Sequence, residues 1–252
     1  LPDGTRHEYL ASGGVILAAG DFSASPELKA KYATELAAAV DAVNPTSTGD
    51  GIRMGVEAGG VVINGDYIRG PILRFVPPPA QGWLHRIPPM PFFTRLMAWA
   101  FDHLPAAILR PFLMSFLTTA LAPERAMFAD GTVLIDLEGR RFADECQSPE
   151  NAAAMRPKGM AYLVFDDKVA RRYGAWPHYV STAPSIGYAY IDDYRRTRPD
   201  IFHRADTLEE LATLMGVNPP AFESSIAEYN ADNAGDDRLR RRERPALDTP
   251  PY

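Results

Sequence analysis

The sequence predicts an α/β region followed by an α+β region, and three observations carry that prediction. The N-terminal part alternates apolar runs with helical stretches, in the order strand, helix, loop, helix, strand, which is typical of α/β layering. From Glu124 onward, short strands and turns precede two helices. Prolines cluster at 71–91, 105–123 and 245–251, so they mark irregular connections between the regular parts.

The N-terminal elements follow from local signals. Residues 14–18 (GVILA) form an apolar run between glycines, which predicts a strand buried on both faces, and 61–63 (VVI) predicts another. Ser25-Pro26-Glu27 supplies an N-cap, a proline at the first position and an acid in the first turn. We therefore expect a helix over about 26–43. A second helix is expected between the loop at 48–51 and the glycines at 59–60.

Local signals also predict the C-terminal elements. Residues 132–136 and 162–165 predict strands. Thr207 and Glu210 have the spacing of a capping box, and Gly216 ends the helix that they begin. The next helix starts at 218–219, with Phe222, Ile226 and Tyr229 on one side. We expect one domain at 1–122, a second at 123–245, and a return toward the first domain at 246–252.

Composition and charge limit the classes of molecule that this protein is expected to bind. Hydrophobic residues make up 46% and charged residues 23% of the chain, as in ordinary globular proteins. The net charge of −6 argues against nucleic acid as a partner, and we interpret the basic run at 238–244, preceded by two aspartates, as a solvated surface. The lone Cys146 fits a reducing, cytoplasmic compartment, and the five histidines show no metal-ligand spacing, so no metal site is expected.

Residues 92–101 and 106–121 are strongly apolar with helical spacing, and they leave two interpretations open. One is a pair of core helices under a covering domain. The other is an apolar entrance that rests on a membrane surface and admits a hydrophobic substrate. The longest uncharged stretch, 111–123, is shorter than the roughly 20 residues of a membrane span.

Six motifs in order resemble the family of FAD-dependent fumarate reductases, flavocytochrome-type reductases and 3-ketosteroid dehydrogenases. They are 14–22 (GVILAAGDF), 48–51 (TGDG), 139–145 (GRRFADE), 162–166 (YLVFD), 206–230 with Arg244 after it, and 250–252 (PPY). Each motif is weak alone, but their order is specific. The resemblance implies the remnant of an FAD-binding, Rossmann-like domain followed by a substrate-capping domain.

The resemblance also implies where FAD would lie. Ala19 and Gly20 almost lack side chains, which allows close approach of a cofactor to the backbone, although Asp21 replaces the family's second glycine. Thr48, Gly49 and Asp50 are the second candidate group, and the aspartate is the first choice. The alternatives are an ordinary tight turn at 19–20 and a helix N-cap at Asp50.

Three candidate catalytic residues follow from the same resemblance. Glu145 ends the GRRFADE motif, beside Asp144, and two adjacent carboxylates can raise one pKa toward a proton-relay role. The alternative is a salt-bridge cluster with the arginines at 140–141. Arg171 follows the 162–166 strand, one residue from the position of the fumarate reductases' proton donor. Tyr188 is a candidate for a pocket-lining tyrosine, against the default of a core or surface position.

The sequence shows no G-x-G-x-x-G motif after a strand and no glycine-rich segment after the cap. Because Leu1 is followed almost at once by a strand-like run, we expect a chain cut from a longer flavoprotein that does not retain FAD alone. The whole protein would pass a hydride between FAD and a carbon next to a carbonyl or carboxylate of a small molecule, with a hydrophobic, steroid-like substrate favoured. The alternatives are a non-catalytic fragment or interaction module, a fumarate-reductase-like enzyme for a small unsaturated acid, and a module in peripheral contact with a membrane.

Overall fold

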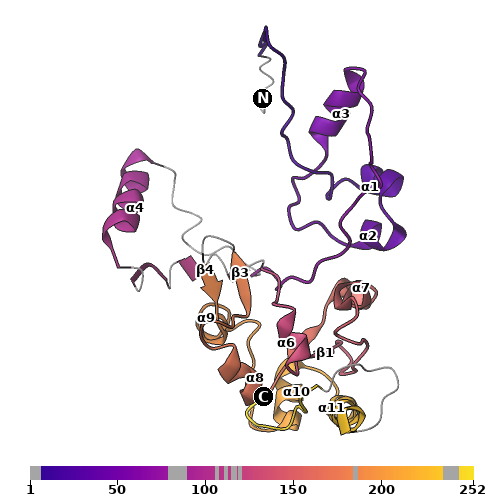
Figure 1. Cartoon of the computed structure of the whole chain (residues 1–252), viewed down its shortest axis with the longest axis vertical. Helices are drawn as coiled ribbons and strands as arrows, with labels where there is room; N and C mark the ends of the chain where they lie inside the picture. The colour runs from indigo at the N-terminus through magenta and orange to yellow at the C-terminus, as the bar shows by residue number, and fades with distance from the viewer. Residues whose placement is uncertain are drawn as a thin grey trace. The chain divides into compact units, whose positions relative to one another are not determined.

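The computed structural model describes residues 7–78, 90–105, 108–110, 113–114, 118, 121–183, 187–234 and 244–252. The chain divides into two compact units, Leu1–Gly70 and Pro71–Tyr252 (Figure 1). This division falls at Gly70, whereas the sequence places the domain boundary at 122, and the latter stays a prediction about domain organisation. The basic run at 238–243 and most of the apolar stretch at 106–121 lie outside the described residues.

The first unit consists of three short helices joined by extended chain: α1 (Pro26–Tyr32), α2 (Glu35–Ala39) and α3 (Asp50–Glu57). Ser25 caps α1 as expected, with its side chain accepting from the N–H of Leu28 at 3.3 Å. The single helix expected over 26–43 is wrong. Thr34 has an extended backbone and caps α2, accepting from the N–H of Ala37, so the chain starts a second helix instead of continuing the first.

The two strands expected in this unit are also wrong. Residues 14–18 and 61–63 form no strand and pair with none of the described residues. Ile16 is 92% exposed and Val61 83% exposed, so neither run is buried. The physical reason is that a strand is held by hydrogen bonds to its neighbours, and these neighbours are not among residues 7–70. An open Rossmann-like sheet is therefore not confirmed.

The second unit contains two small antiparallel sheets. β1 (Val133–Ile135) pairs with β2 (Tyr162–Val164), and β3 (Ser181–Ala183) pairs with β4 (Gly187–Ala189). The strands expected at 132–136 and 162–165 are thus confirmed. The described helices around them are α4 (Pro91–His103), α6 (Ala126–Ala129), α7 (Pro149–Ala154), the short η2 (Pro157–Gly159), α8 (Asp167–Arg172), α9 (Ile191–Thr197), α10 (Leu208–Met215) and α11 (Pro219–Ala234).

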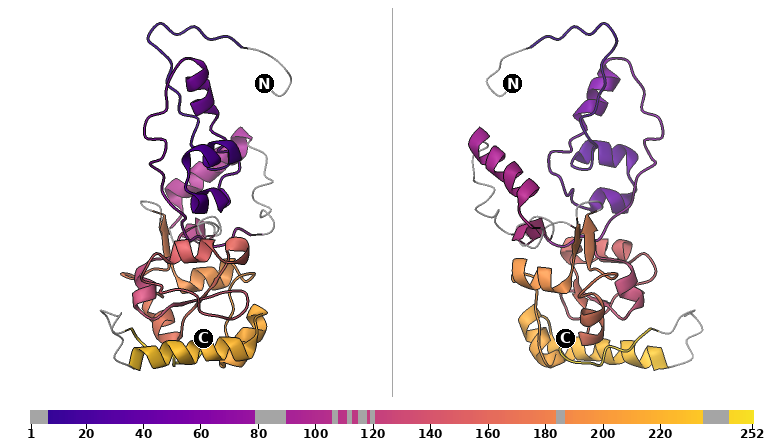
Figure 2. Two further views of the ribbon diagram at one scale, coloured as in Figure 1. Left: turned by 90° about the vertical axis from the view of Figure 1, so that its right-hand side faces the viewer. Right: turned by 60° about the vertical axis from the view of Figure 1, so that its left-hand side comes forward.

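Two apolar cores organise this unit. The first joins one face of β1 and β2 to α10 and α11, which lie against each other (Figure 2). Phe222, Ile226 and Tyr229 of α11 are all buried there, as their spacing predicted. Thr207 caps α10 and Gly216 ends it in the left-handed region, also as expected. The second core gathers buried side chains of α6, α8, α9 and β4, among them Met127, Tyr173 and Tyr194.

Buried Arg198 ties distant segments of this unit together. Its guanidinium donates to the carbonyl of Val76 at 2.6 Å and to that of Thr118 at 3.0 Å, and it forms a two-point ion pair with Asp200. The side chain is 3% exposed. Each guanidinium nitrogen therefore has a protein acceptor in place of water, which is the condition under which a buried charge is tolerated.

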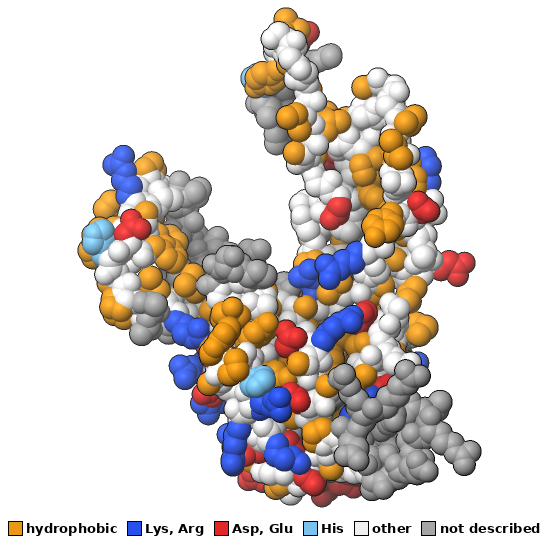
Figure 3. All heavy atoms as spheres, viewed as in Figure 1, with side chains coloured by type: hydrophobic (Ala, Val, Ile, Leu, Met, Phe, Trp, Pro, Cys, Tyr) orange, Lys and Arg blue, Asp and Glu red, His pale blue; other side chains and the backbone are white. Residues whose placement is uncertain are grey.

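Helix α4 confirms the helix expected at 92–101 but differs from the core interpretation. None of its residues is buried, and Phe92 and Trp99 are 70% and 52% exposed. Hydrophobic side chains line the helix in the space-filling view (Figure 3). Among the described residues, no helix has the length and apolar character needed to cross a bilayer.

Candidate functional site

The two candidate cofactor segments of the first unit meet in the structure. A methyl group placed on Gly51 would lie 3.1 Å from the Cβ of Ala19, tighter than ordinary packing. The N-terminus of α3 and the segment at 19–20 thus approach each other closely at a point where neither segment carries a bulky side chain. Sequence reasoning predicted both segments, and the structure brings them together.

The carboxylate of Asp50 is held by its own loop. Thr48 donates to it from Oγ1 at 3.0 Å, and Arg53 donates at 3.2 Å while also binding the carbonyl of Thr48 at 2.9 Å. Gly49, not Asp50, is the N-cap of α3, and it makes no side-chain cap bond. The N-cap alternative for Asp50 is therefore wrong. The side chain remains 69% exposed, so a fixed carboxylate faces solvent at this end of α3.

The backbone at Gly20 is open to a flat ligand. Its φ is +88°, and nothing lies within 4 Å of the position that a side chain would take. Neighbouring Asp21 folds back, accepting from the N–H of Ser23 at 2.8 Å, and this hydrogen bond holds the pKa of Asp21 below its usual value. The Ala19–Gly20 segment and the Thr48–Asp50 loop together fit a group such as FAD, because they offer accessible backbone and one fixed acceptor.

Glu145 lies at the centre of a buried ionic cluster in the second unit. Its side chain is fully buried and accepts from Arg141 at 3.0 and 2.9 Å, from Arg244 at 2.8 Å and from the N–H of Leu134 at 3.2 Å. Both guanidiniums are themselves largely buried, with 15% and 5% exposure. The salt-bridge alternative from the sequence describes this arrangement, except that the cluster is buried and its second arginine is Arg244 instead of Arg140.

Asp144 completes the cluster by pairing with Arg244. Burial raises the pKa of Asp144, but the hydrogen bonds that it accepts from Arg244, the N–H of Cys146 and Gln147, together with the charge of Arg244, outweigh burial and hold this pKa below the ordinary value. The two adjacent carboxylates therefore do not push the pKa of Asp144 upward, and the proton-relay role of Glu145 stays a prediction. The positive charges of Arg141 and Arg244 neutralise the negative charges of Asp144 and Glu145.

Arg171 stands on α8 with its side chain 82% exposed, 2.5 Å from Asp167 in the preceding turn. Asp167 is mostly buried, at 14% exposure. The pairing follows from the i, i+4 spacing on one helix face. Arg171 is thus accessible, but it has a local partner for its charge.

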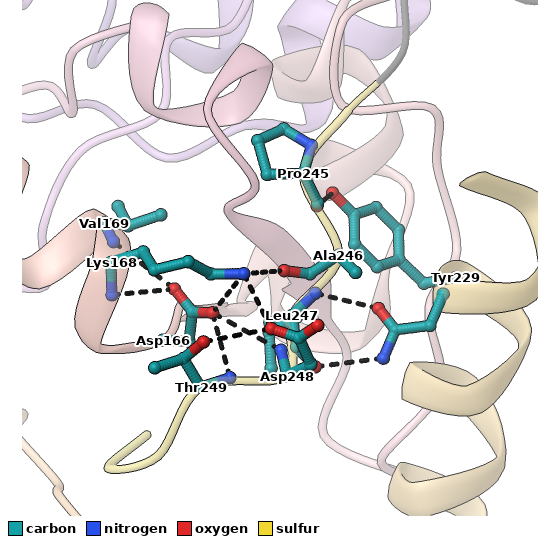
Figure 4. Close-up of polar contacts among 10 residues, drawn as sticks. Asp166, Lys168, Val169, Tyr229, Pro245, Ala246, Leu247, Asp248 and Thr249 are labelled. Carbon is teal, nitrogen blue, oxygen red and sulfur yellow. Dashed lines mark hydrogen bonds and ion pairs between the residues drawn. The ribbon is translucent and has the colours of Figure 1, made fainter. Parts of the chain in front are cut away.

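Asp166, which precedes α8, acts as a clamp (Figure 4). One oxygen accepts from the N–H groups of Lys168 and Val169 and caps the helix, at 3.1 and 3.3 Å. The other accepts from the N–H groups of Asp248 and Thr249, at 3.3 and 3.2 Å. A nearly buried carboxylate therefore fixes the C-terminal segment to α8. Sequence reasoning assigned no role to Asp166, although an aspartate immediately before a helix is an N-cap signal.

The same C-terminal segment is bound from α11. The side chain of Asn230 makes two hydrogen bonds to the backbone of Leu247, at 2.9 and 2.8 Å. The hydroxyl of Tyr229 donates to the carbonyl of Pro245 at 3.2 Å. The Tyr-Asn pair that ends the resemblance at 206–230 is therefore structural: it positions the segment that carries Arg244.

Tyr188 belongs to a small aromatic group on the surface. Its ring lies 5.0 Å from that of Trp176 and 4.9 Å from that of Tyr179, between centroids. Trp176 is 65% exposed and Tyr188 37%. No hydrogen bond, ion pair or ring contact joins Tyr188, Arg171 and Glu145 to one another within the described part of the chain. The structure thus places the three candidate catalytic residues in separate local settings.

Comparison with known proteins agrees with the sequence motifs. Residues 1–70 match the FAD binding domain family. The chain is 28% identical over 235 residues to the NADH:acrylate oxidoreductase of Vibrio harveyi, covering 91% of this chain and 18% of that protein. It is 28% identical over 244 residues to the 4-oxocyclohex-2-ene-1-carboxylate 5-dehydrogenase of Sinomonas cyclohexanicum, covering 89% and 33%.

The fold is similar to that of a flavocytochrome c3 fumarate reductase in its open conformation, with a TM-score of 0.59 and 18% identity over 92% of this chain and 32% of the other. The chain spans between about a fifth and a third of the curated relatives that it matches. The resemblance to FAD-dependent oxidoreductases of the fumarate reductase type, with FAD as the cofactor, is confirmed.

Proposed function

We propose that this chain forms part of an FAD-dependent oxidoreductase that passes a hydride between the flavin and a carbon next to a carbonyl or carboxylate. The contact between Ala19 and Gly51, inside the region that matches the FAD binding domain, carries the proposal. FAD supplies the redox chemistry when bound, and the chain supplies position and charge.

Within this proposal, each cofactor segment has a distinct task. The segment at Ala19 and Gly20 gives a cofactor access to the backbone, because nothing surrounds the side-chain position of Gly20. Thr48 and Arg53 hold the carboxylate of Asp50 in one orientation, so that it accepts hydrogen bonds without first being ordered.

The second unit would cover the substrate, and its candidate residues divide by setting. Tyr188 and its neighbour Trp176 present aromatic surface to solvent, which favours an apolar, ring-shaped substrate. Arg171 is the accessible candidate for a proton path. Glu145 has no access to solvent, so we assign it the task of positioning Arg141 and Arg244.

The substrate class follows from these surfaces together with the relatives. One relative acts on a cyclic enone carboxylate, as its name states, and another on acrylate. A small dicarboxylate would need converging cationic groups. Arg171 is paired with Asp167, and Arg141 and Arg244 are paired with Glu145, so these arginines are already committed. A cyclic enone or ketosteroid is therefore preferred to fumarate.

The cofactor assignment is tested by a matched pair of variants in the whole polypeptide that contains this chain. Gly20 and Gly59 both have φ of +88° with open space around them, so Gly20→Ala and Gly59→Ala carry the same backbone cost of about 1 kcal/mol. We expect Gly20→Ala alone to weaken FAD binding, by roughly tenfold or more, in a titration followed by flavin fluorescence. Equal affinities in the two variants would contradict the assignment.

The reaction itself is tested by turnover of the flavin-loaded whole polypeptide. We expect reduction or oxidation of a cyclic enone or 3-ketosteroid to exceed that of fumarate. Preferential turnover of fumarate would support the alternative enzyme for a small unsaturated acid. A polypeptide that binds no flavin and turns over none of these compounds would support the alternative of a non-catalytic interaction module.

Helix α4 supports a second candidate role, peripheral contact with a membrane. Its apolar residues are exposed along the helix, and Phe92 is 70% exposed. Burial of such residues in the headgroup region stabilises a bound helix. Co-sedimentation with lipid vesicles at low salt tests this role: the wild type should pellet and a Phe92→Glu variant should not. Absence of pelleting for the wild type would dismiss it.

A further inference from the structure

A cavity of about 550 Å³ lies in the second unit, and all three residues of β2 line it. Its lining includes residues 161–165 and 201–204, and Pro251 and Tyr252 also line it. Leu211 and Met215 of α10 add apolar side chains. The cavity is therefore bordered by β2 and by the segment that follows the turn at Ile201, and it is lined largely by apolar groups.

Both backbone stretches have unused hydrogen-bonding edges. β2 pairs only with β1 among the described strands, while β1 is engaged on its other side through a bridge between Ile135 and Arg141. Elsewhere in the cavity lining, His203 and Arg204 make no backbone hydrogen bond to any residue that the structure describes. An edge of this kind is a template for another strand.

The Tyr252 end shows how such a strand would enter. The N–H of Ala205 donates to the carbonyl of Tyr252 at 3.0 Å, and the N–H of Tyr252 donates to the carbonyl of Ala205 at 2.8 Å. Two residues that exchange both bonds form a hydrogen-bonded antiparallel pair. The first residue of a backbone that continued from Tyr252 in this direction would lie opposite Arg204 and the second opposite His203, where the next hydrogen-bonded pair would fall beside the cavity.

The volume of the cavity agrees with that of a short β-strand. One strand residue occupies on the order of 160 Å³, from a rise of about 3.3 Å, a strand spacing of about 4.8 Å and a layer thickness of about 10 Å. The cavity of about 550 Å³ thus accommodates roughly three residues. β2 itself has three residues, Tyr162–Val164. We propose that this cavity is the binding groove for an extended polypeptide strand that enters from Tyr252 and joins the free edge of β2.

The test is a covalent extension of the full chain. A segment of alternating valine and threonine, about six residues long, is added after Tyr252, because attachment there gives the strand a high effective concentration. A glycine-serine segment of equal length is the control. We expect the valine-threonine segment alone to slow amide hydrogen exchange at 162–164 and 203–204, by about tenfold or more, and to raise the melting temperature.

A matched pair of substitutions separates backbone pairing from simple filling of the cavity. His203→Pro removes the edge N–H of a residue that makes no backbone hydrogen bond in the described structure, whereas His203→Ala keeps it. In the extended chain, the exchange protection should disappear in His203→Pro and persist in His203→Ala. Circular dichroism of both unextended variants checks that the fold is intact.

Three results would overturn the proposal. The first is equal protection by both extensions, and the second is equal protection in both His203 variants. The third is concentration-dependent dimerisation of the unextended chain through β2, because a second copy would then be the occupant. Tighter binding of a small apolar probe such as dodecanoate, without any effect of the valine-threonine strand, would reassign the groove to a small molecule.

Discussion

Glu145 and Arg244 form a buried ion pair of 2.8 Å between residues 99 positions apart in the sequence. Arg141 approaches the same carboxylate from the other side. The pair connects the turn after β1 to the C-terminal segment. Because the ion pair is buried, loss of either partner should destabilise the fold. The remaining charge could not be hydrated unless the fold opened.

We expect Glu145→Gln to lower the free energy of unfolding by about 3–5 kcal/mol, because two buried guanidiniums would lose their counter-charge. Urea denaturation followed by circular dichroism measures the loss. Glu138→Gln is the control, since Glu138 is exposed in the same turn region. Unchanged stability with lost turnover in the whole protein would instead indicate a catalytic task for Glu145.

Stability should depend on pH through Asp144. The pKa of this group is lower in the folded state than its ordinary value, so its contribution is present above about pH 4 and is lost as the pH falls through the lowered pKa. The difference in unfolding free energy between wild type and Asp144→Asn should therefore shrink between about pH 5 and pH 3. A difference that stays constant over this range would contradict the pairing with Arg244.

Asp166→Ala should destabilise the second unit by roughly 2–4 kcal/mol, because it removes both the α8 cap and two acceptors for the C-terminal segment. Asp166→Asn keeps one acceptor oxygen and should cost less. Thermal unfolding of the two variants gives the order. Asp248→Asn is the matched control, because that side chain is 59% exposed. Equal effects of Asp166→Ala and Asp248→Asn would refute the clamp.

Arg171→Ala should lower the free energy of unfolding by about 1 kcal/mol or less, since its side chain is 82% exposed although its partner Asp167 is mostly buried. If Arg171 serves the proton path, the variant should lower kcat of the flavin-loaded whole protein by roughly a hundredfold or more. Arg172→Ala, which removes a neighbouring arginine paired with Asp130, controls for the loss of one positive charge. Equal kcat in the two variants would remove Arg171 from the mechanism.

Local sequence signals were sufficient to predict the elements whose stabilising interactions are also local. The N-caps at Ser25 and Thr207 and the glycine that ends α10 all appear as the sequence predicts. The apolar face of α11 was readable because helical spacing alone decides which side chains point to the core. Strands β1 and β2 were each predicted for a similar reason, because both are short runs of strand-forming residues between turns.

Prediction from the sequence failed for residues whose interaction partner lies far away in the chain or outside the described residues. The run around Ile16 has the composition of a buried parallel strand, yet strand formation requires neighbouring strands. Arg244 was noted only as one mark of the resemblance, because its carboxylate partners precede it by about a hundred residues. The cofactor segments were found through resemblance, whereas their mutual contact at Ala19 and Gly51 required the structure.

Arg198 has a consequence for the order of events during synthesis. The carbonyls of Thr118 and Val76 precede their donor by 80 and 122 residues. At a translation rate of roughly 5–20 residues per second, the carbonyl of Val76 emerges on the order of ten seconds before Arg198 can bind it. The segment around Val76 must therefore remain hydrated or be sheltered by a chaperone until α9 has been made. Closure of the second unit is a late step for the nascent chain.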